Sequence, residues 1–131
     1  VRPILGADGL LSGSVVDVGS GNGSPGLILA ALRPDLKFTL LEPRAKRWAF
    51  LREAARAMGV ENVVVLRERS DSYDGPLADT ATMRAVGLDP EALRPLLAAS
   101  GCVLVFGGPP LQGSETIRLP AGSVVQRRCF T

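Results

Sequence analysis

The sequence of 131 residues contains no histidine. Histidine is the usual general base near neutral pH and a common metal ligand, so chemistry that depends on it is excluded. Long apolar runs are also missing, and none reaches the ~20 residues that a membrane-spanning helix needs. The start of the chain does not resemble a secretion signal, because Ser12 and Gly13 interrupt the apolar pair Leu10 and Leu11 at once. We expect a protein with no metal centre and no membrane contact.

Cysteine and aromatic residues are scarce. The two cysteines, Cys102 and Cys129, fall in apolar runs typical of buried strands, and they form neither a close pair nor a metal-ligand spacing. We therefore expect two free thiols and a reducing, cytoplasmic location. Aromatic residues make up only 5% of the chain, which limits the surface on which a nucleic-acid base could stack.

Length and charge set broad limits. A chain of this size is expected to form one domain with a real hydrophobic core, here over residues 1–131 with an irregular lead-in at 1–13. Fifteen basic residues against 13 acidic ones give a net charge of +2. That small excess is a weak indication of an anionic partner.

One stretch organises the rest of the chain, residues 15–26, with the sequence VVDVGSGNGSPG. The β-branched valines predict a buried strand, and the glycines that follow allow a tight turn that a ligand can approach closely. Pro25 suits the first turn of a helix, which the apolar residues after it continue. Backbone N–H groups should therefore face a crevice at the carboxyl end of a strand, where open α/β sheets bind nucleotide-like ligands.

The remaining pattern alternates strands with helices. The helix at 43–58 is the clearest, with an apolar stripe of Trp48, Leu51, Ala55 and Met58 that ends at Gly59. The predicted strands are 14–18, 37–41, 63–66, 80–86, 102–106, 116–119 and 124–130, and the other predicted helices are 25–32 and 90–99. The strand at 63–66 should be buried, and the last two strands should form a hairpin. The sequence thus predicts a Rossmann-like α/β fold with a mostly parallel sheet, helices on both faces and an antiparallel C-terminal hairpin.

The glycine turn alone leaves the ligand open. Residues 21–26 fit the G-x-G-x-x-G pattern of dinucleotide sites, a weak signal by itself. Glu42 lies about 20 residues further on, at the end of the next strand, where a carboxylate can accept from ribose hydroxyls. NAD and S-adenosylmethionine (SAM) both carry such a ribose, so Glu42 does not separate them. A solvated residue at a strand end is the alternative for Glu42.

Asp17, two residues before Gly19, helps to choose between NAD and SAM. The run at 17–26 resembles the first motif of class I SAM-dependent methyltransferases, in which that acid helps to hold the methionine amino group. Three further runs, RPDLKFTLLE at 33–42, KRWAFLR at 46–52 and GVENV at 59–63, make the chain similar to the RsmG (GidB) family. The similarity is strong over residues 14–71 and weaker beyond, where Met83-Arg84-Ala85 resembles a Ser-Arg-Ala segment of the family.

The resemblance implies a SAM site and a substrate. Members of this family methylate N7 of a guanine in small-subunit ribosomal RNA, so the small ribosomal subunit is the expected partner. The implied cofactor contacts, together with the glycine turn, are Asp17, Gly19, Ser20, Gly21, Gly23, Ser24, Glu42, Pro43, Ser70, Asp71 and Arg84. The basic residues expected to contact RNA are Arg44, Lys46 and Arg47, with a solvated helix face as the alternative.

Methyl transfer to guanine N7 is compatible with a chain that lacks histidine. N7 is nucleophilic without losing a proton, so the reaction needs in-line positioning rather than a general base, and no catalytic residue is assigned. Phe106 could line the acceptor pocket or pack in the core, and Arg84 should have a carboxylate or ligand partner, with Asp71 as one candidate.

The family usually carries a lysine where this chain has Gly107. The alternatives are a small-molecule methyltransferase, a non-catalytic SAM-binding or assembly protein and, more weakly, an NAD-binding domain.

Overall fold

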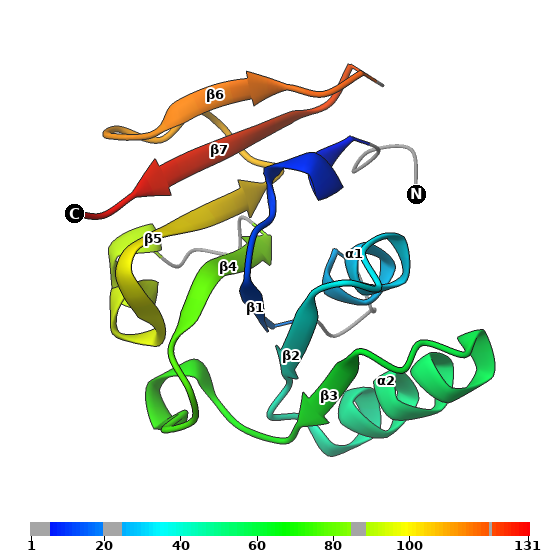
Figure 1. Cartoon of the computed structure of the whole chain (residues 1–131). Coiled ribbons are helices and arrows are strands. Elements are labelled where there is room, and N and C mark those ends of the chain that lie inside the picture. Colours follow the sequence, from blue (N-terminus) through cyan, green and yellow to red (C-terminus); the bar gives the residue numbers. More distant parts are fainter. Residues whose placement is uncertain (1–5, 20–24, 85–88, 121) are drawn as a thin grey trace.

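The computed structural model describes residues 6–19, 25–84, 89–120 and 122–131. Within these residues, seven strands form one sheet in the order β3-β2-β1-β4-β5-β7-β6 (Figure 1). The strands are β1 (Ser14–Val18), β2 (Lys37–Leu41), β3 (Val63–Leu66), β4 (Ala78–Arg84), β5 (Leu97–Phe106), β6 (Glu115–Arg118) and β7 (Val124–Cys129). The first five are parallel, and β7 pairs antiparallel with both β5 and β6. The predicted mostly parallel sheet with a terminal antiparallel hairpin is therefore confirmed.

The glycine turn follows β1, which lies inside the sheet. The valines of β1 pair with β2 on one side and with β4 on the other, so β1 is buried along most of its length. The strand order reverses here, because β2 and β3 extend to one side of β1 while β4 and β5 extend to the other. Ligands of open α/β sheets bind at such a switch point, outside the carboxyl ends of the strands.

One face of the sheet is covered by α1 (Gly26–Leu32), α2 (Ala45–Met58) and the 3₁₀ helix η2 (Ala7–Leu10). Gly59 ends α2 in the left-handed conformation (φ 71°), as its position predicts. Two expectations for this layer were wrong. Met58 is 52% exposed and lines an open groove instead of joining the core. The described part of the predicted irregular lead-in contains a short helix, η2, which places Ala7 in the core.

The other face carries two 3₁₀ helices, η3 (Ser70–Ser72) and η4 (Pro90–Leu96), the second of which packs Leu93 and Leu96 into the core. The sequence predicts an α-helix to Ala99, but η4 ends at Leu96 and β5 begins at Leu97. Pro95 explains the difference, since it lacks the N–H that an α-helix needs there. The start of η4 is capped, because the Asp89 side chain accepts from the Glu91 N–H at 2.9 Å.

Two of the strands, β3 and β4, differ from their predicted burial or bounds. The strand β3 lies at one edge, so it is not fully buried: Val63 and Val65 pack under α2, while Val64 is 56% exposed on the opposite face. The strand predicted at 80–86 is β4, which begins at Ala78. Its last two predicted residues, 85 and 86, lie outside the described residues.

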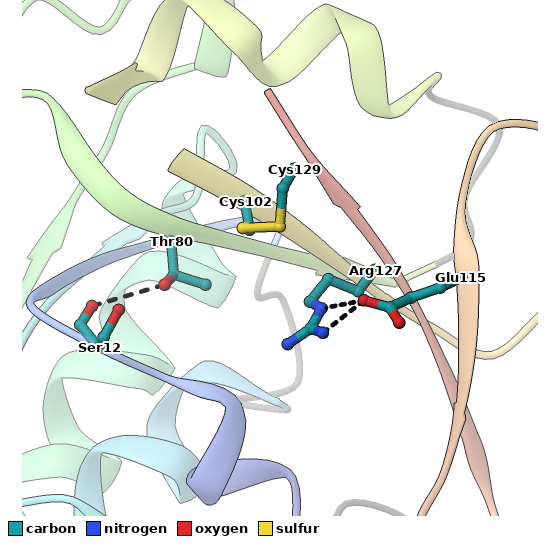
Figure 2. The surroundings of a disulfide bond; sticks show 6 residues. All are labelled: Ser12, Thr80, Cys102, Glu115, Arg127 and Cys129. Carbon is teal, nitrogen blue, oxygen red and sulfur yellow. Dashed lines mark hydrogen bonds and ion pairs between the residues drawn. A yellow bond between two sulfur atoms is a disulfide. The ribbon is translucent and has the colours of Figure 1, made fainter. Parts of the chain in front are cut away.

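The cysteines are not free thiols, which corrects the sequence-based prediction. The antiparallel register of β5 and β7 places Cys102 directly opposite Cys129, and the two sulfur atoms are bonded (Figure 2). Neither is fully buried, since Cys102 is half-buried and Cys129 is exposed. The separation of 27 residues gives no sign of this proximity, because β6 lies between β5 and β7 in the sequence although β5 and β7 are neighbours in the sheet.

Candidate cofactor site

The site begins where β1 ends. Gly19 has a left-handed φ of 70°, which a side chain would strain, and its N–H donates to the Leu41 carbonyl at 3.0 Å. This bond ties the first residue of the glycine turn to the end of β2. Among the described residues, a Cβ on Gly19 would meet no atom within 4 Å, so these residues leave space beside Gly19. The predicted contacts Ser20, Gly21, Gly23 and Ser24 lie outside the described residues.

Asp17 is fully buried below this turn. Its carboxylate accepts a hydrogen bond from the Thr82 hydroxyl on β4 and another from the backbone N–H of Gly26, the first residue of α1. Burial raises the pKa of Asp17 to about 7, although Thr82, the Arg84 charge and the Gly26 N–H all oppose the rise. Asp17 therefore joins three elements, β1, β4 and α1, and changes its charge near neutral pH.

Glu42 follows β2 and is also fully buried. Its Oε1 pairs with Arg44 Nε at 2.7 Å, and its backbone N–H donates to the Leu66 carbonyl at 2.9 Å. Its other carboxylate oxygen, Oε2, is buried and has no hydrogen-bond partner among the described residues. A buried acceptor without a donor is costly, so this oxygen suits a ligand that brings a hydroxyl donor. The alternative of a solvated strand-end residue is therefore wrong for Glu42.

The remaining predicted contacts lie on the rim of the same sheet edge. Pro43 is exposed, and Ser70 and Asp71 belong to η3 after β3. The carboxylate of Asp71 is ion-paired with Arg69 at 3.2 Å and is largely exposed. Arg84 ends β4 with an exposed side chain, within electrostatic reach of Asp17.

Arg84 therefore departs from its predicted setting. The sequence predicts Arg84 inside a strand with a carboxylate or ligand partner, for which Asp71 is one candidate. The structure instead leaves the Arg84 side chain exposed, at the last described residue of β4. Thus Asp17, Gly19 and Glu42 meet at the carboxyl ends of neighbouring strands β1 and β2, and Arg84 ends β4 on the other side of β1.

The basic residues near the site divide into two kinds. Arg44 is the partner of buried Glu42, so it belongs to the rim of the site. Lys46 and Arg47 lie in the first turn of α2 and are exposed. Trp48 is only half-buried, not a full core residue, and its indole N–H donates to the Val65 carbonyl at 3.1 Å.

Two residues that matter here escaped the sequence-based prediction. Thr82 holds Asp17 from the neighbouring strand, and nothing in the sequence indicates which residue of β4 faces β1 at that height. Gly26 must lack a side chain, because a Cβ there would lie 2.6 Å from Cγ of Asp17. The last glycine of the G-x-G-x-x-G pattern, which permits close helix–strand packing, was the available signal for Gly26.

The other side-chain expectations are settled by burial. Phe106 is 4% exposed and packs in the core, so of its two proposed roles core packing is correct. Gly107 is exposed and has a left-handed φ of 79°.

Across the described parts of the chain, His, Cys, Asp and Glu form no group of three that could hold a metal ion, and no helix is long and apolar enough to cross a membrane.

The fold is that of the Rossmann-like class I methyltransferases. A SAM-dependent methyltransferase from Aquifex aeolicus is similar to it with a TM-score of 0.72 at 16% sequence identity, over 98% of this chain and 88% of that one. A family model, GidB or rRNA small subunit methyltransferase G, matches residues 6–109. The chain belongs to this family, as its sequence motifs predict.

Two curated relatives support the same assignment. Both are named ribosomal RNA small subunit methyltransferase G. The protein from Thermobifida fusca is 44% identical over 98 residues, which is 72% of this chain and 41% of the relative. The one from Thermotoga neapolitana is 41% identical over 108 residues, which is 78% of this chain and 47% of the relative. The chain therefore spans less than half the length of these relatives.

Proposed function

We propose that the chain binds SAM at the carboxyl ends of β1, β2 and β4. The observation that carries this proposal is Glu42, a fully buried carboxylate at the end of β2 with one oxygen that has no donor among the described residues. A ribose presents two adjacent hydroxyl donors, which such a carboxylate accepts. The pairing of Oε1 with Arg44 fixes the carboxylate and leaves Oε2 for the sugar.

The rest of the predicted site completes the proposal. Asp17 holds the start of α1 in place through the Gly26 N–H, and with it the end of the glycine turn. Gly19 leaves open space beside the backbone where the ligand would approach. Further contacts would come from the glycine turn and from the rim, namely Ser20, Gly21, Gly23, Ser24, Pro43, Ser70, Asp71 and Arg84.

The proposed reaction is transfer of the methyl group to N7 of a guanine in small-subunit ribosomal RNA. The sulfonium of SAM supplies an electrophilic methyl group. The N7 lone pair forms the new C–N bond as the C–S bond breaks in line, which gives a cationic 7-methylguanine and neutral S-adenosylhomocysteine. No proton leaves N7, so positioning replaces a general base, in agreement with a chain without histidine.

The RNA would lie against the start of α2. Lys46 and Arg47 are exposed beside the residues that follow β2, where their charges can meet phosphates close to the cofactor. Arg44 would contribute less, because its guanidinium is already paired with Glu42. The proposed substrate is part of the ribosome, which places the protein in the cytoplasm.

A methyl-transfer assay tests the reaction. The chain is incubated with SAM labelled in the methyl group and with naked small-subunit RNA, whole small subunits or a panel of metabolites. We expect labelled 7-methylguanine in RNA and no labelled metabolite. Label in a metabolite would favour a small-molecule methyltransferase, and SAM binding with no transfer to any acceptor would favour a non-catalytic binding protein.

The RNA surface is tested with a matched pair of double variants. Replacing Lys46 and Arg47 with glutamine should raise KM for RNA and reduce the salt dependence of RNA binding by about two phosphate contacts. Replacing Lys37 and Arg118 with glutamine removes the same charge from exposed positions on β2 and β6 and should change neither. Equal effects of the two double variants would reject the proposed surface.

A further inference from the structure

The two cysteines occupy a particular position in the β5–β7 ladder. The neighbouring pair is hydrogen-bonded, since the Phe130 N–H donates to the Gly101 carbonyl at 2.9 Å. Cys102 and Cys129 therefore form the next, non-hydrogen-bonded pair, in which facing side chains come closest. The backbone register alone thus brings the two thiols together whenever the strands are paired, whether or not the bond is present.

The two cysteines differ in exposure. Cys129 is the last residue of β7 and is exposed, whereas Cys102 is half-buried in β5. In Figure 2 the bond lies across the sheet between Thr80 on one side and the ion pair of Arg127 with Glu115 on the other. Exposed disulfides are the ones that exchange readily with thiols in solution.

We propose that Cys102 and Cys129 form a thiol–disulfide exchange site that reacts with low-molecular-weight thiols and disulfides through Cys129. A small thiolate attacks Cys129 Sγ, the Cys102–Cys129 bond breaks, and Cys102 leaves as a thiolate. A second small thiolate attacks the small-molecule sulfur of the mixed disulfide and releases the Cys129 thiolate. In total, two small thiols give two electrons and two protons to the protein and become one small disulfide, and the reverse reaction restores the bond.

The position of the bond limits what its reduction can change. Beyond Cys129, the Phe130 ring lies between the guanidinium groups of Arg94 and Arg128, 5.2 and 5.1 Å from its centre. Arg128 is in turn ion-paired with Glu91 of η4 at 2.9 Å. These contacts and the buried core of β7 remain when the bond opens, so the strand should stay in place with a looser end.

The cofactor site should not respond to this change. Cys102 lies near the amino end of the parallel part of β5, four residues before its carboxyl end at Phe106. That separation is about 13 Å along the strand. The site of Asp17 and Glu42 lies at the carboxyl ends, so the exchange site acts on the C-terminal hairpin and not on ligand contacts. This inference does not depend on the proposed activity.

Redox titration of the native protein tests the inference. The chain is equilibrated with mixtures of reduced and oxidised glutathione, quenched with acid and alkylated, and its intact mass is measured. We expect a single two-electron transition between a species with no alkylated cysteine and one with two, without denaturant. A bond that glutathione reduces only after the protein is unfolded would overturn the proposal.

Two single variants test the direction of attack. With Cys102 replaced by serine, oxidised glutathione should add one glutathionyl group to Cys129 at least tenfold faster than it adds to Cys102 in the Cys129→Ser variant. Equal rates would reject Cys129 as the point of entry. Amide exchange of the wild-type chain gives an independent readout: on reduction it should accelerate in β7 and stay unchanged in β1 and β2, whereas a change in β1 and β2 would contradict the local effect.

Discussion

A Cβ on Gly26 would lie 2.6 Å from Cγ of Asp17, so the first residue of α1 packs against the buried acid of β1 with no room for a side chain. This contact lets the Gly26 N–H reach the carboxylate. The same carboxylate also accepts from Thr82 of β4, so it couples the start of α1 to the sheet. Both the fold and the candidate site therefore require glycine at position 26.

Replacing Gly26 with alanine should lower the free energy of unfolding by about 1–3 kcal/mol, because the new methyl group must displace a buried side chain. Urea unfolding measures the change. The matched control is Gly9→Ala in η2, where a Cβ would meet no atom within 4 Å, and this variant should stay within about 0.5 kcal/mol of the wild type. Equal losses in the two variants would show that the Asp17 contact is not responsible.

The charge of Asp17 should make stability depend on pH. Its pKa is about 7 in the folded chain, against the ordinary value of 3.8. Between these values the folded state holds a proton that the unfolded chain has lost. Its contribution to stability is therefore complete below about pH 4 and is lost as the pH rises to about 7. At about 1.4 kcal/mol per pKa unit, the loss amounts to about 4 kcal/mol.

The variant Asp17→Asn isolates this contribution, because an amide keeps the shape of the side chain but does not titrate. We expect the stability of Asp17→Asn relative to the wild type to increase steadily across this pH range in urea unfolding experiments. Parallel profiles for the two proteins would mean that Asp17 is ionised throughout. A SAM affinity that rises over the same range would further indicate that the ammonium group of the ligand favours the ionised acid.

Gly19 allows backbone strain to be separated from blockage of the site. Gly19→Ala should cost about 1–2 kcal/mol of stability, because φ is 70°. A methyl group there meets no atom of the described residues within 4 Å and should leave SAM binding measurable. Gly19→Arg adds a long side chain in the same open space and should abolish binding. Calorimetry measures both affinities, and an arginine variant that still binds SAM would place the ligand elsewhere.

Reduction of the disulfide should lower the free energy of unfolding by about 3.5 kcal/mol, the loop-closure value for a separation of 27 residues. Denaturant unfolding with and without a reducing agent measures the difference. The double variant Cys102→Ser/Cys129→Ser should show no dependence on the reducing agent. A wild-type chain whose stability is equally independent would show that the bond does not constrain the unfolded state.

The fold could be predicted from the sequence where local pattern decides structure. The valines of β1, the glycine turn and the periodic face of α2 each specify one element, and the alternation of elements then specifies a parallel sheet. Features that depend on the order of strands could not be predicted in this way. The exposure of Val64 follows from the position of β3 at the sheet edge. The Cys102–Cys129 bond follows from the pairing of β5 with β7, which are separated in the sequence by β6.

The candidate site divides along the same line. Asp17 and Glu42 were identified because the first lies near the end of a recognisable strand and the second directly follows one, each within a recognisable motif. Thr82 was missed because its role depends on which residue of β4 stands next to Asp17. Arg84 stays a predicted site residue, and the exposure of its side chain could not be predicted from the apolar residues around it.

Calorimetric titration of the chain with SAM and with NAD tests the central claim most directly. We predict that SAM binds and NAD does not, and that Glu42→Gln weakens SAM binding at least tenfold because the ribose loses a charged acceptor. The control Glu61→Gln, an exposed position after α2, should bind SAM like the wild type. Binding of NAD without SAM, or an unchanged SAM affinity in Glu42→Gln, would contradict the account.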